Sequence, residues 1–200
     1  MIEKKSMLKI FYSQFKSAIV VLCAFTFLIG VVYTGAITIF AQILFPQKAN
    51  GSLVVSNNKI IGSKLIGQYF SSPKYFWGRP SATGVFPYNS ADSKGSNLGP
   101  TNPKLIAAIH KRIEILKKSD PENKQPIPID LVTASGSGLD PEISPLAAIY
   151  QLHRVANARN MNDKEVLAIV NAHIQKRQFG FLGEPRVNVL QLNMALDAIK

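Results

Sequence analysis

A run of small and hydroxyl-bearing residues, Ser135-Gly136-Ser137-Gly138, has the residue types best suited in this sequence to binding a phosphate. Glycines let a backbone approach a phosphate closely, and backbone amides donate hydrogen bonds to its oxygens. The phosphate-loop pattern G-x-x-x-x-G-K-[ST] does not occur, and this G-x-G fragment lacks the third glycine of a dinucleotide fingerprint. The run is therefore a weak nucleotide-binding candidate, and a rigid surface loop is the favoured interpretation.

Nucleophilic and metal chemistry have less support. Ser137 does not sit in a G-x-S-x-G elbow, because Ser135 stands where the first glycine is required. Three histidines lie in segments predicted to be helical, without H-E-x-x-H spacing, and a single cysteine cannot complete a zinc site. These histidines are His110, His153 and His173. We therefore predict no catalytic residue and no metal site in this chain.

Two charged positions are instead predicted to shape loops. Asp140 and Glu142 flank Pro141 in a predicted turn, where an aspartate commonly caps backbone amides. Arg79 lies in the block FWGRPSA, and we expect it to brace an aromatic loop by pairing with a carboxylate or stacking on Trp77.

Two predicted helices begin with a capping residue followed by proline. Asn102-Pro103 begins a helix that should end near residues 119–121, and Ser144-Pro145 begins a helix through residue 160. The first is expected to face inward with Ile106, Ile109, Ile113 and Leu116. The second is expected to face inward with Leu146, Ile149, Leu152, Val155 and Ala156.

Two more helices are predicted near the C-terminus. Asn162 and Glu165 have the spacing of a capping box, beginning a helix that Gly180 should end. A last short helix is expected over residues 190–199, after a strand within residues 179–189.

Further strands are predicted before these helices. Residues 52–62 read as a hairpin that turns at Asn57-Asn58, and residues 131–133 as a short strand. Residues 63–103 are rich in Gly, Pro and Ser, yet they are predicted to be ordered because buried aromatic rings hold them in place. Those rings are Phe70, Tyr75, Phe76, Trp77, Phe86 and Tyr88. The fold class expected is α+β, with a small sheet and about four helices in one compact domain.

An uncharged stretch from Ser17 to Gln47 exceeds the roughly 20 apolar residues that a membrane-spanning helix needs. Four lysines and one glutamate precede it, so the positive-inside rule places the N-terminus in the cytoplasm and the main domain outside. The predicted division is a cytoplasmic tail over residues 1–16, a single-pass anchor over 17–46, and an exported domain over 47–200.

The chain is strongly basic. Its 200 residues carry 23 Lys and Arg against 12 Asp and Glu, a formal net charge of +11. After Pro46, 19 Lys and Arg against 11 Asp and Glu leave a surplus of eight positive charges. For an exported domain nucleic acid is not the expected partner, which leaves an acidic protein face, anionic lipid headgroups or a solvated basic surface. The one cysteine, Cys23, excludes an intramolecular disulfide.

Behind the single anchor, several blocks carry a resemblance to a known family over nearly the whole chain. These blocks are GSKLIGQYF, YFWGRPSA, SKGSNLGPTNP, DLVTASGSGLDPEISPLAAIYQLHRVANAR and GFLGEPRVNVLQLNMALD. They resemble the KdpC family, the C subunits of the Kdp potassium-transporting P-type ATPase.

The resemblance implies membership of a complex in the bacterial inner membrane. Its other members are a channel-like potassium-binding subunit, a P-type ATPase subunit and a small single-span subunit. No cofactor is implied for this chain, because ATP and K⁺ are handled by the complex. A non-catalytic accessory subunit is expected, needed for assembly, stability and coupling of the channel-like and ATP-hydrolysing subunits. The alternative is a catalytic chaperone that binds nucleotide through Ser135, Gly136, Ser137 and Gly138 and raises the ATP affinity of the P-type subunit.

Contacts with the partner subunits are expected from the membrane helix and from the loops. Small residues in the helix permit close helix contacts, and aromatic or hydroxyl-rich loops are expected to dock on the channel-like subunit. The interface candidates are Gly30, Gly35, Phe76, Trp77, Arg79, Ser96, Asn97 and Asp140.

Overall fold

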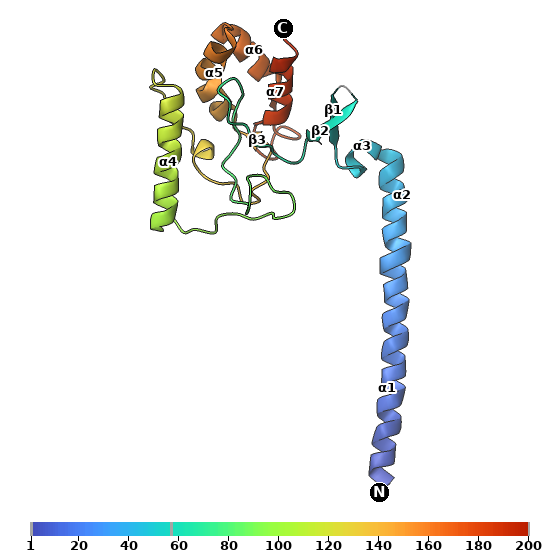
Figure 1. Cartoon of the computed structure of the whole chain (residues 1–200). Coiled ribbons are helices and arrows are strands. Elements are labelled where there is room, and N and C mark those ends of the chain that lie inside the picture. Colours follow the sequence, from blue (N-terminus) through green and yellow to red (C-terminus); the bar gives the residue numbers. More distant parts are fainter. Residues whose placement is uncertain (1, 57, 200) are drawn as a thin grey trace. The chain divides into compact units, whose positions relative to one another are not determined.

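The computed structural model describes residues 2–56 and 58–199, with the side chains of residues 2–6 and 8 left out. The chain divides into two compact units, Met1–Ser52 and Leu53–Lys200. We call the second the C-terminal unit. The first unit is helical (Figure 1) and contains α1 (Ile2–Phe27), the π-helical turn η1 (Leu28–Tyr33), α2 (Thr34–Leu44) and α3 (Pro46–Ala49).

The first unit contains the helix predicted to cross a membrane. Among the described residues, one helix is long and apolar enough to do so, and it spans Lys9–Leu44. Its 36 residues exceed the roughly 20 that cross the hydrocarbon layer. The π-helical turn lies within it, and the Thr34 hydroxyl donates to the Ile29 carbonyl, 2.8 Å away. The structure thus confirms the apolar helix, while the limits of its embedded part stay a prediction.

The C-terminal unit begins with the predicted hairpin. β1 (Leu53–Ser56) and β2 (Lys59–Ser63) pair antiparallel. Asn58 has a φ of 59°, the left-handed conformation that asparagine tolerates at a tight turn, whereas Asn57 lies outside the described residues.

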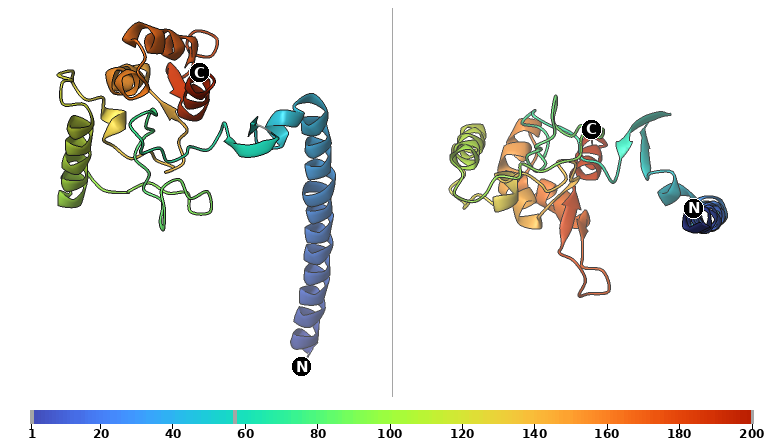
Figure 2. Two further views of the ribbon diagram at one scale, coloured as in Figure 1. Left: turned by 45° about the horizontal axis from the view of Figure 1, so that its top comes forward. Right: turned by 90° about the horizontal axis from the view of Figure 1, so that it is seen from below.

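A second sheet joins distant parts of the unit. Its strand order is β3-β5-β4, all antiparallel, with β3 (Glu142–Ile143), β4 (Ile174–Gln175) and β5 (Arg186–Asn188). The connection between β4 and β5 extends away from the helices (Figure 2). Val187 of the central strand pairs with Ile143 and Ile174 and is fully buried.

The four predicted helices are present, which confirms the α+β class. They are α4 (Pro103–Ser119), α5 (Pro145–Arg159), α6 (Asp163–Ala172) and α7 (Val189–Asp197). Asn102 and Ser144 cap the first two through their side chains, and Asn162 forms a complete capping box with Glu165.

The core lies among α5, α6, α7 and β5. These helices lie side by side, whereas α4 stands at the edge of the unit (Figures 1 and 2). Fully buried side chains fill the core: Phe76, Val155, Val166, Val170, Val187, Leu192 and Leu196. Burial of one such side chain contributes about 1.5–3 kcal/mol to stability.

The predicted inward faces of two helices are partly wrong. Leu146 is 70% exposed and Ile149 is also exposed, while Ala147 and Ala148 are fully buried. Small alanines let the backbone of α5 approach its neighbours, which turns the larger Leu146 outward. Ile106 of α4 is likewise exposed, although Leu116 is buried as predicted.

Two further secondary-structure predictions are wrong. The helix begun by Asn162 ends at Ala172 instead of near Gly180, because the following residues form β4 and pair with β5. Residues 131–133 are not a strand, because a 3₁₀ turn, η2 (Ile129–Leu131), is closed by the Thr133 hydroxyl donating to the Ile129 carbonyl over 2.8 Å.

The segment between β2 and α4 is irregular and ordered, as predicted, but its rings differ in burial. Phe76 is fully buried, and Phe70 and Trp77 pack against the core. Phe86 is 55% exposed, which corrects the expectation that it holds the segment in place. Polar contacts hold that part of the segment instead.

Candidate functional site

The backbone at Phe76 and Trp77 is held by two side-chain amides. The Asn193 amide accepts from the Phe76 N–H (2.8 Å) and donates to the Phe76 carbonyl (3.0 Å). The Gln151 amide does the same for Trp77, at 2.8 and 3.1 Å. Because buried backbone groups require partners, these amides from α7 and α5 replace a neighbouring strand.

Arg154 of α5 also holds the backbone of this segment. Its guanidinium donates to the carbonyls of Pro73 (2.5 Å) and Tyr75 (3.1 Å) and to the Gln151 side chain (2.8 Å). It also lies over the Trp77 ring, 4.0 Å from the centroid. Burial lowers the pKa of Arg154 to about 10, so the group remains charged near neutral pH.

Arg79 takes the first of its two predicted roles. It pairs with Asp140 at 3.1 Å, and Arg154 occupies the Trp77 ring. Asp140 also accepts from the Glu142 N–H at 3.0 Å, which confirms its capping role. The Tyr88 hydroxyl donates to the Arg79 carbonyl at 2.6 Å, and burial raises the pKa of this hydroxyl well above its usual range.

The loop over residues 135–138 is held by its own chain. The buried Ser135 hydroxyl accepts from the Gly138 N–H (2.9 Å), and the Ser137 hydroxyl accepts from the Leu139 N–H (3.1 Å). The Ser135 N–H donates to the Pro80 carbonyl at 3.2 Å. These amides and hydroxyls are the groups that a phosphate cradle would offer, and here they stabilise the loop itself.

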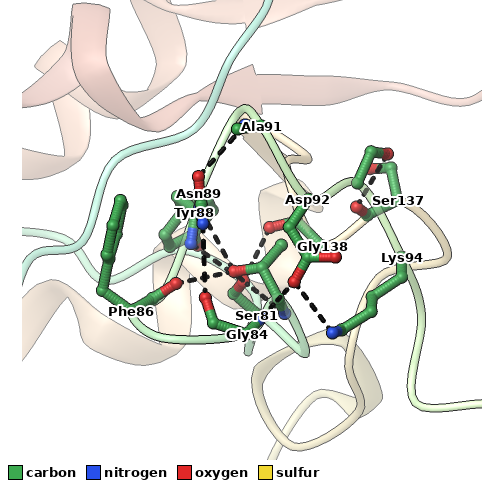
Figure 3. Close-up of polar contacts among 12 residues, drawn as sticks. Ser81, Gly84, Phe86, Tyr88, Asn89, Ala91, Asp92, Lys94, Ser137 and Gly138 are labelled. Atoms are coloured by element: carbon green, nitrogen blue, oxygen red, sulfur yellow. Dashed lines mark hydrogen bonds and ion pairs between the residues drawn. The ribbon is translucent and has the colours of Figure 1, made fainter.

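A second loop, residues 81–94, packs against the first (Figure 3). The Ser81 hydroxyl lies between Tyr88 and Gly138, accepting from the Tyr88 N–H (2.9 Å) and donating to the Gly138 carbonyl (2.7 Å). The Ser93 hydroxyl donates to the Ser137 carbonyl at 3.1 Å. We call residues 79–94 and 134–140 together the paired loops.

Asp92 closes the second loop. Its carboxylate accepts from the Gly84 N–H at 2.5 Å and pairs with Lys94 at 2.8 Å (Figure 3). The Lys94 hydrogen bond, followed by that from Gly84, lowers the pKa of Asp92. Because the pKa of Asp92 is lower in the folded state, these contacts stabilise the loop fully at pH values above the pKa of an ordinary aspartate. The stabilisation is lost as the pH falls through the lowered pKa of Asp92.

Gly138 lies where the two loops approach most closely. Its φ is +69°, and a Cβ there would lie 2.6 Å from the Lys94 carbonyl oxygen and 2.7 Å from the Thr83 methyl group. By contrast, a Cβ on Gly136 would meet nothing within 4 Å. The backbone therefore requires glycine at position 138 and not at 136.

Gly138→Ala is expected to lower the free energy of unfolding of the C-terminal unit by about 1–3 kcal/mol, because it adds backbone strain and a clash with a carbonyl. Gly136→Ala is the matched control and should change it by less than about 0.5 kcal/mol. Urea unfolding of the two variants, followed by Trp77 emission, gives the comparison. Equal effects of both substitutions would contradict the paired-loop geometry.

The remaining predicted site residues lie elsewhere. Ser96 and Asn97 are exposed beyond the second loop, and Asn97 has a φ of 52°. Gly30 and Gly35 belong to the first unit, where a Cβ on either would meet nothing within 4 Å. The structure thus brings Arg79 and Asp140 together beside the loop 135–138, with Phe76 and Trp77 on the adjoining segment.

The histidines and the possible metal ligands can be compared with the part of the chain that the structure describes. His153 pairs with the buried Asp120 at 2.8 Å, and the hydrogen bond to Asp120 raises the pKa of His153. Among the described residues, no three His, Cys, Asp or Glu side chains gather as a metal site would require.

Sequence patterns do not single out Gln151, Arg154 and Asn193, which hold residues 70–77, called here the aromatic segment. One signal was available, since Gln151 and Arg154 are three residues apart and therefore share a helix face in α5. Two polar residues at this spacing usually lie on the solvent-exposed face of a helix. Only the tertiary structure shows that Gln151 and Arg154 are buried.

The chain is similar to known proteins over most of its length. The KdpC family, described as "K+-transporting ATPase, c chain", matches residues 15–198. A "Potassium-transporting ATPase KdpC subunit" from Methylococcus capsulatus is 55% identical over 188 residues, which is 94% of this chain and 99% of the relative. Proteins of the same name from Dechloromonas aromatica (59% over 170 residues, 85% and 89% of the chains) and Herpetosiphon aurantiacus (56% over 186 residues, 93% and 96%) are also similar.

Proposed function

This chain belongs to the KdpC family of potassium-transporting ATPase subunits, and we propose that it serves assembly, stability and coupling within that complex. It is an accessory subunit of a P-type ATPase and not catalytic on its own. The proposal adds that it links a channel-like potassium-binding subunit to the ATP-hydrolysing subunit, in a complex that also holds a small single-span subunit. It needs no cofactor, since ATP and K⁺ are handled by its partners.

The observation that carries this proposal is the internal bonding of the paired loops. The Ser135 and Ser137 hydroxyls accept from backbone amides of their own loop, and the Ser81 hydroxyl donates to the Gly138 carbonyl. A phosphate could take up those amides only by breaking these bonds. A rigid loop pair with satisfied polar groups is suited to docking on another protein, because little conformational entropy is lost on binding.

Orientation is part of the proposal: the helix anchors the chain in the bacterial inner membrane, with the N-terminus in the cytoplasm and the C-terminal unit outside. Four lysines and one glutamate precede Ser17, where the uncharged stretch of the helix begins, and the positive-inside rule therefore supports this direction.

Ser137→Cys in a Cys23→Ala background tests the orientation, because it gives a chain with one thiol. A membrane-impermeant maleimide should label this thiol in spheroplasts before the membrane is opened, since Ser137 is exposed. Leu8→Cys in the same background is the matched control and should react only after permeabilisation. Labelling of position 137 only after permeabilisation would reverse the orientation.

Assembly through the membrane helix is tested at the two glycines. Gly30→Leu and Gly35→Leu should each reduce co-purification of this chain with the complex in mild detergent at least several-fold, because bulk prevents close helix packing. The two glycines are five positions apart in the sequence, which places them about 140° apart on an α-helix, so each variant tests a different side of the helix. Ala36→Leu, about 100° around the helix from Gly35, is the control for added bulk. Unchanged recovery of both glycine variants would refute contact through these residues.

The nucleotide-binding alternative predicts a different result. If the chain were a catalytic chaperone that raises the ATP affinity of the P-type subunit, the full-length chain should bind an ATP analogue, and Ser137→Ala should weaken that binding. Our proposal predicts no saturable binding. Tight, Ser137-dependent binding would replace it with the alternative.

A further inference from the structure

A cavity of about 420 Å³ lies between α4 and the aromatic segment of the C-terminal unit. Its volume falls within the range typical of sites for small organic molecules. Most of its wall is apolar or aromatic, with contributions from Phe70, Trp77, Tyr88, Ala108, Ile115 and Leu116. An aromatic or alkyl group would therefore lose its contact with water on entering.

The charged groups in the wall are all cationic: Arg79, Lys111 and Arg112. Arg79 is already paired with Asp140. Neither Lys111 nor Arg112 forms a salt bridge with a carboxylate of the described residues. The wall thus has a surplus of positive charge that the chain itself does not neutralise.

Arg112 is the cation most affected by its surroundings. It is half-buried, its guanidinium donates to the Val132 carbonyl at 2.7 Å, and burial lowers its pKa. One carbonyl satisfies only part of the donor capacity of a guanidinium, which has five N–H groups. In addition, the Nε of Arg79 is buried without a hydrogen-bond partner. A half-buried guanidinium with spare donors beside an apolar wall favours an anion with an apolar body.

We propose that this cavity binds a small amphiphilic anion, in which an aromatic or alkyl body packs against Trp77 and Leu116 and a carboxylate meets Arg112. The head pairs with the guanidinium while the body displaces water from the apolar wall. An amine of the same size is rejected, because the wall would place a second positive charge beside Lys111 and Arg112. The site is separate from the loop 135–138 and does not depend on the proposed role in assembly.

Trp77 makes the proposal measurable, because it is the only tryptophan of the chain and lies in the cavity wall. The full-length chain, in nanodiscs of neutral phosphatidylcholine, is titrated with phenylbutyrate while Trp77 emission is recorded. A saturable change in emission is expected. Phenylbutylamine, which has the same apolar body and the opposite charge, should produce no saturable change over the same concentrations.

Two pairs of variants locate the site. Ala108→Leu fills the cavity and should abolish the response, whereas Ala107→Leu, at the exposed neighbouring position, should leave it unchanged. Arg112→Gln should weaken phenylbutyrate binding about tenfold or more through loss of a charge-assisted hydrogen bond. Lys118→Gln on the same helix should not weaken it.

The titrations and the variants distinguish binding in the cavity from partition into the lipid. Equal responses to the acid and the amine would show partition into the lipid and overturn the proposal, as would full binding by Ala108→Leu. If Ala108→Leu fails to fold, as shown by loss of its urea transition, Arg112→Lys decides. That variant keeps the charge and should recover part of the affinity lost in Arg112→Gln, whereas equal affinities in the two Arg112 variants would contradict a charge-dependent site.

Discussion

Arg154→Met is expected to lower the free energy of unfolding of the C-terminal unit by about 3–5 kcal/mol. The carbonyls of Pro73 and Tyr75 and the side chain of Gln151 would each lose a charged donor in a buried setting. Contact with the Trp77 ring would be lost as well, at a cost of about 0.5–2 kcal/mol. Methionine needs no desolvation of a charge, which offsets part of this loss.

The measurement is urea unfolding of the full-length chain in detergent, followed by Trp77 emission, which reports on the C-terminal unit alone. Arg177→Met is the control, because Arg177 pairs with Glu184 where both side chains are exposed, and its loss should cost less than about 0.5 kcal/mol. Arg154→Lys should fall between wild type and Arg154→Met, since lysine keeps the charge without the planar fork. A loss below about 1 kcal/mol in Arg154→Met would show that water or a shifted side chain satisfies the carbonyls.

Such a loss is large compared with the stability of an ordinary domain, which is about 5–15 kcal/mol in total. The segment that Arg154 supports contains Phe76 and Trp77 and leads directly into Arg79 and the paired loops. Packing of the aromatic segment therefore positions the loops that we propose to dock. A defect in assembly caused by Arg154→Met would accordingly act through the fold and not through a direct contact.

The sequence predicts the helices well because their signals are local. Asn102, Ser144 and Asn162 each cap an amide two or three residues later, so the pattern that begins a helix lies within a few positions. The strands of the second sheet are two or three residues long, which is too short for an alternating pattern to emerge. The sequence nevertheless predicts a strand within residues 179–189, where β5 lies, whereas its helical pattern continues through the residues that form β4.

Side-chain placement is harder to predict, since it depends on partners far away in the sequence. Trp77 and Gln151 are 74 residues apart, and Phe76 and Asn193 are 117 apart. A polar residue in a helical pattern normally indicates the solvated face, and that rule misassigns Gln151 and Asn193. The sequence indicates that Arg79 pairs with a carboxylate or stacks on Trp77, but only the fold shows that the carboxylate is that of Asp140.

In the loop 135–138, too, the local features can be predicted from the sequence, whereas the long-range contacts cannot. Its composition pointed to small residues and close backbone approach, and the structure shows which glycine needs that freedom, since only Gly138 has a positive φ and a carbonyl within 3 Å of its missing Cβ. The neighbour it approaches, Lys94, belongs to a segment with no regular structure. The partner of the loop could therefore not have been named from periodicity or capping signals.

Asn193→Leu is expected to lower the free energy of unfolding of the C-terminal unit by about 2–4 kcal/mol. Leucine fills a similar space, but the Phe76 N–H and carbonyl would be left in the core without partners, at about 1–3 kcal/mol each. Added apolar burial offsets roughly 1 kcal/mol. Asn171→Leu on the exposed side of α6 is the control and should change stability by less than about 0.5 kcal/mol.

Asn193→Asp separates loss of the donor from loss of the acceptor. A buried carboxyl has a raised pKa, and in its protonated form it can donate to the Phe76 carbonyl as the amide does. Its stabilising effect is therefore present at low pH and is lost as the pH rises through the raised folded-state pKa. The free energy of unfolding of Asn193→Asp should approach that of wild type at mildly acidic pH and lie well below it at alkaline pH. Wild type is measured at each pH as well, because the raised pKa of His153 means that wild type itself loses some stability as the pH rises. A deficit in Asn193→Asp that does not change with pH would mean that water, rather than Asn193, satisfies the Phe76 carbonyl.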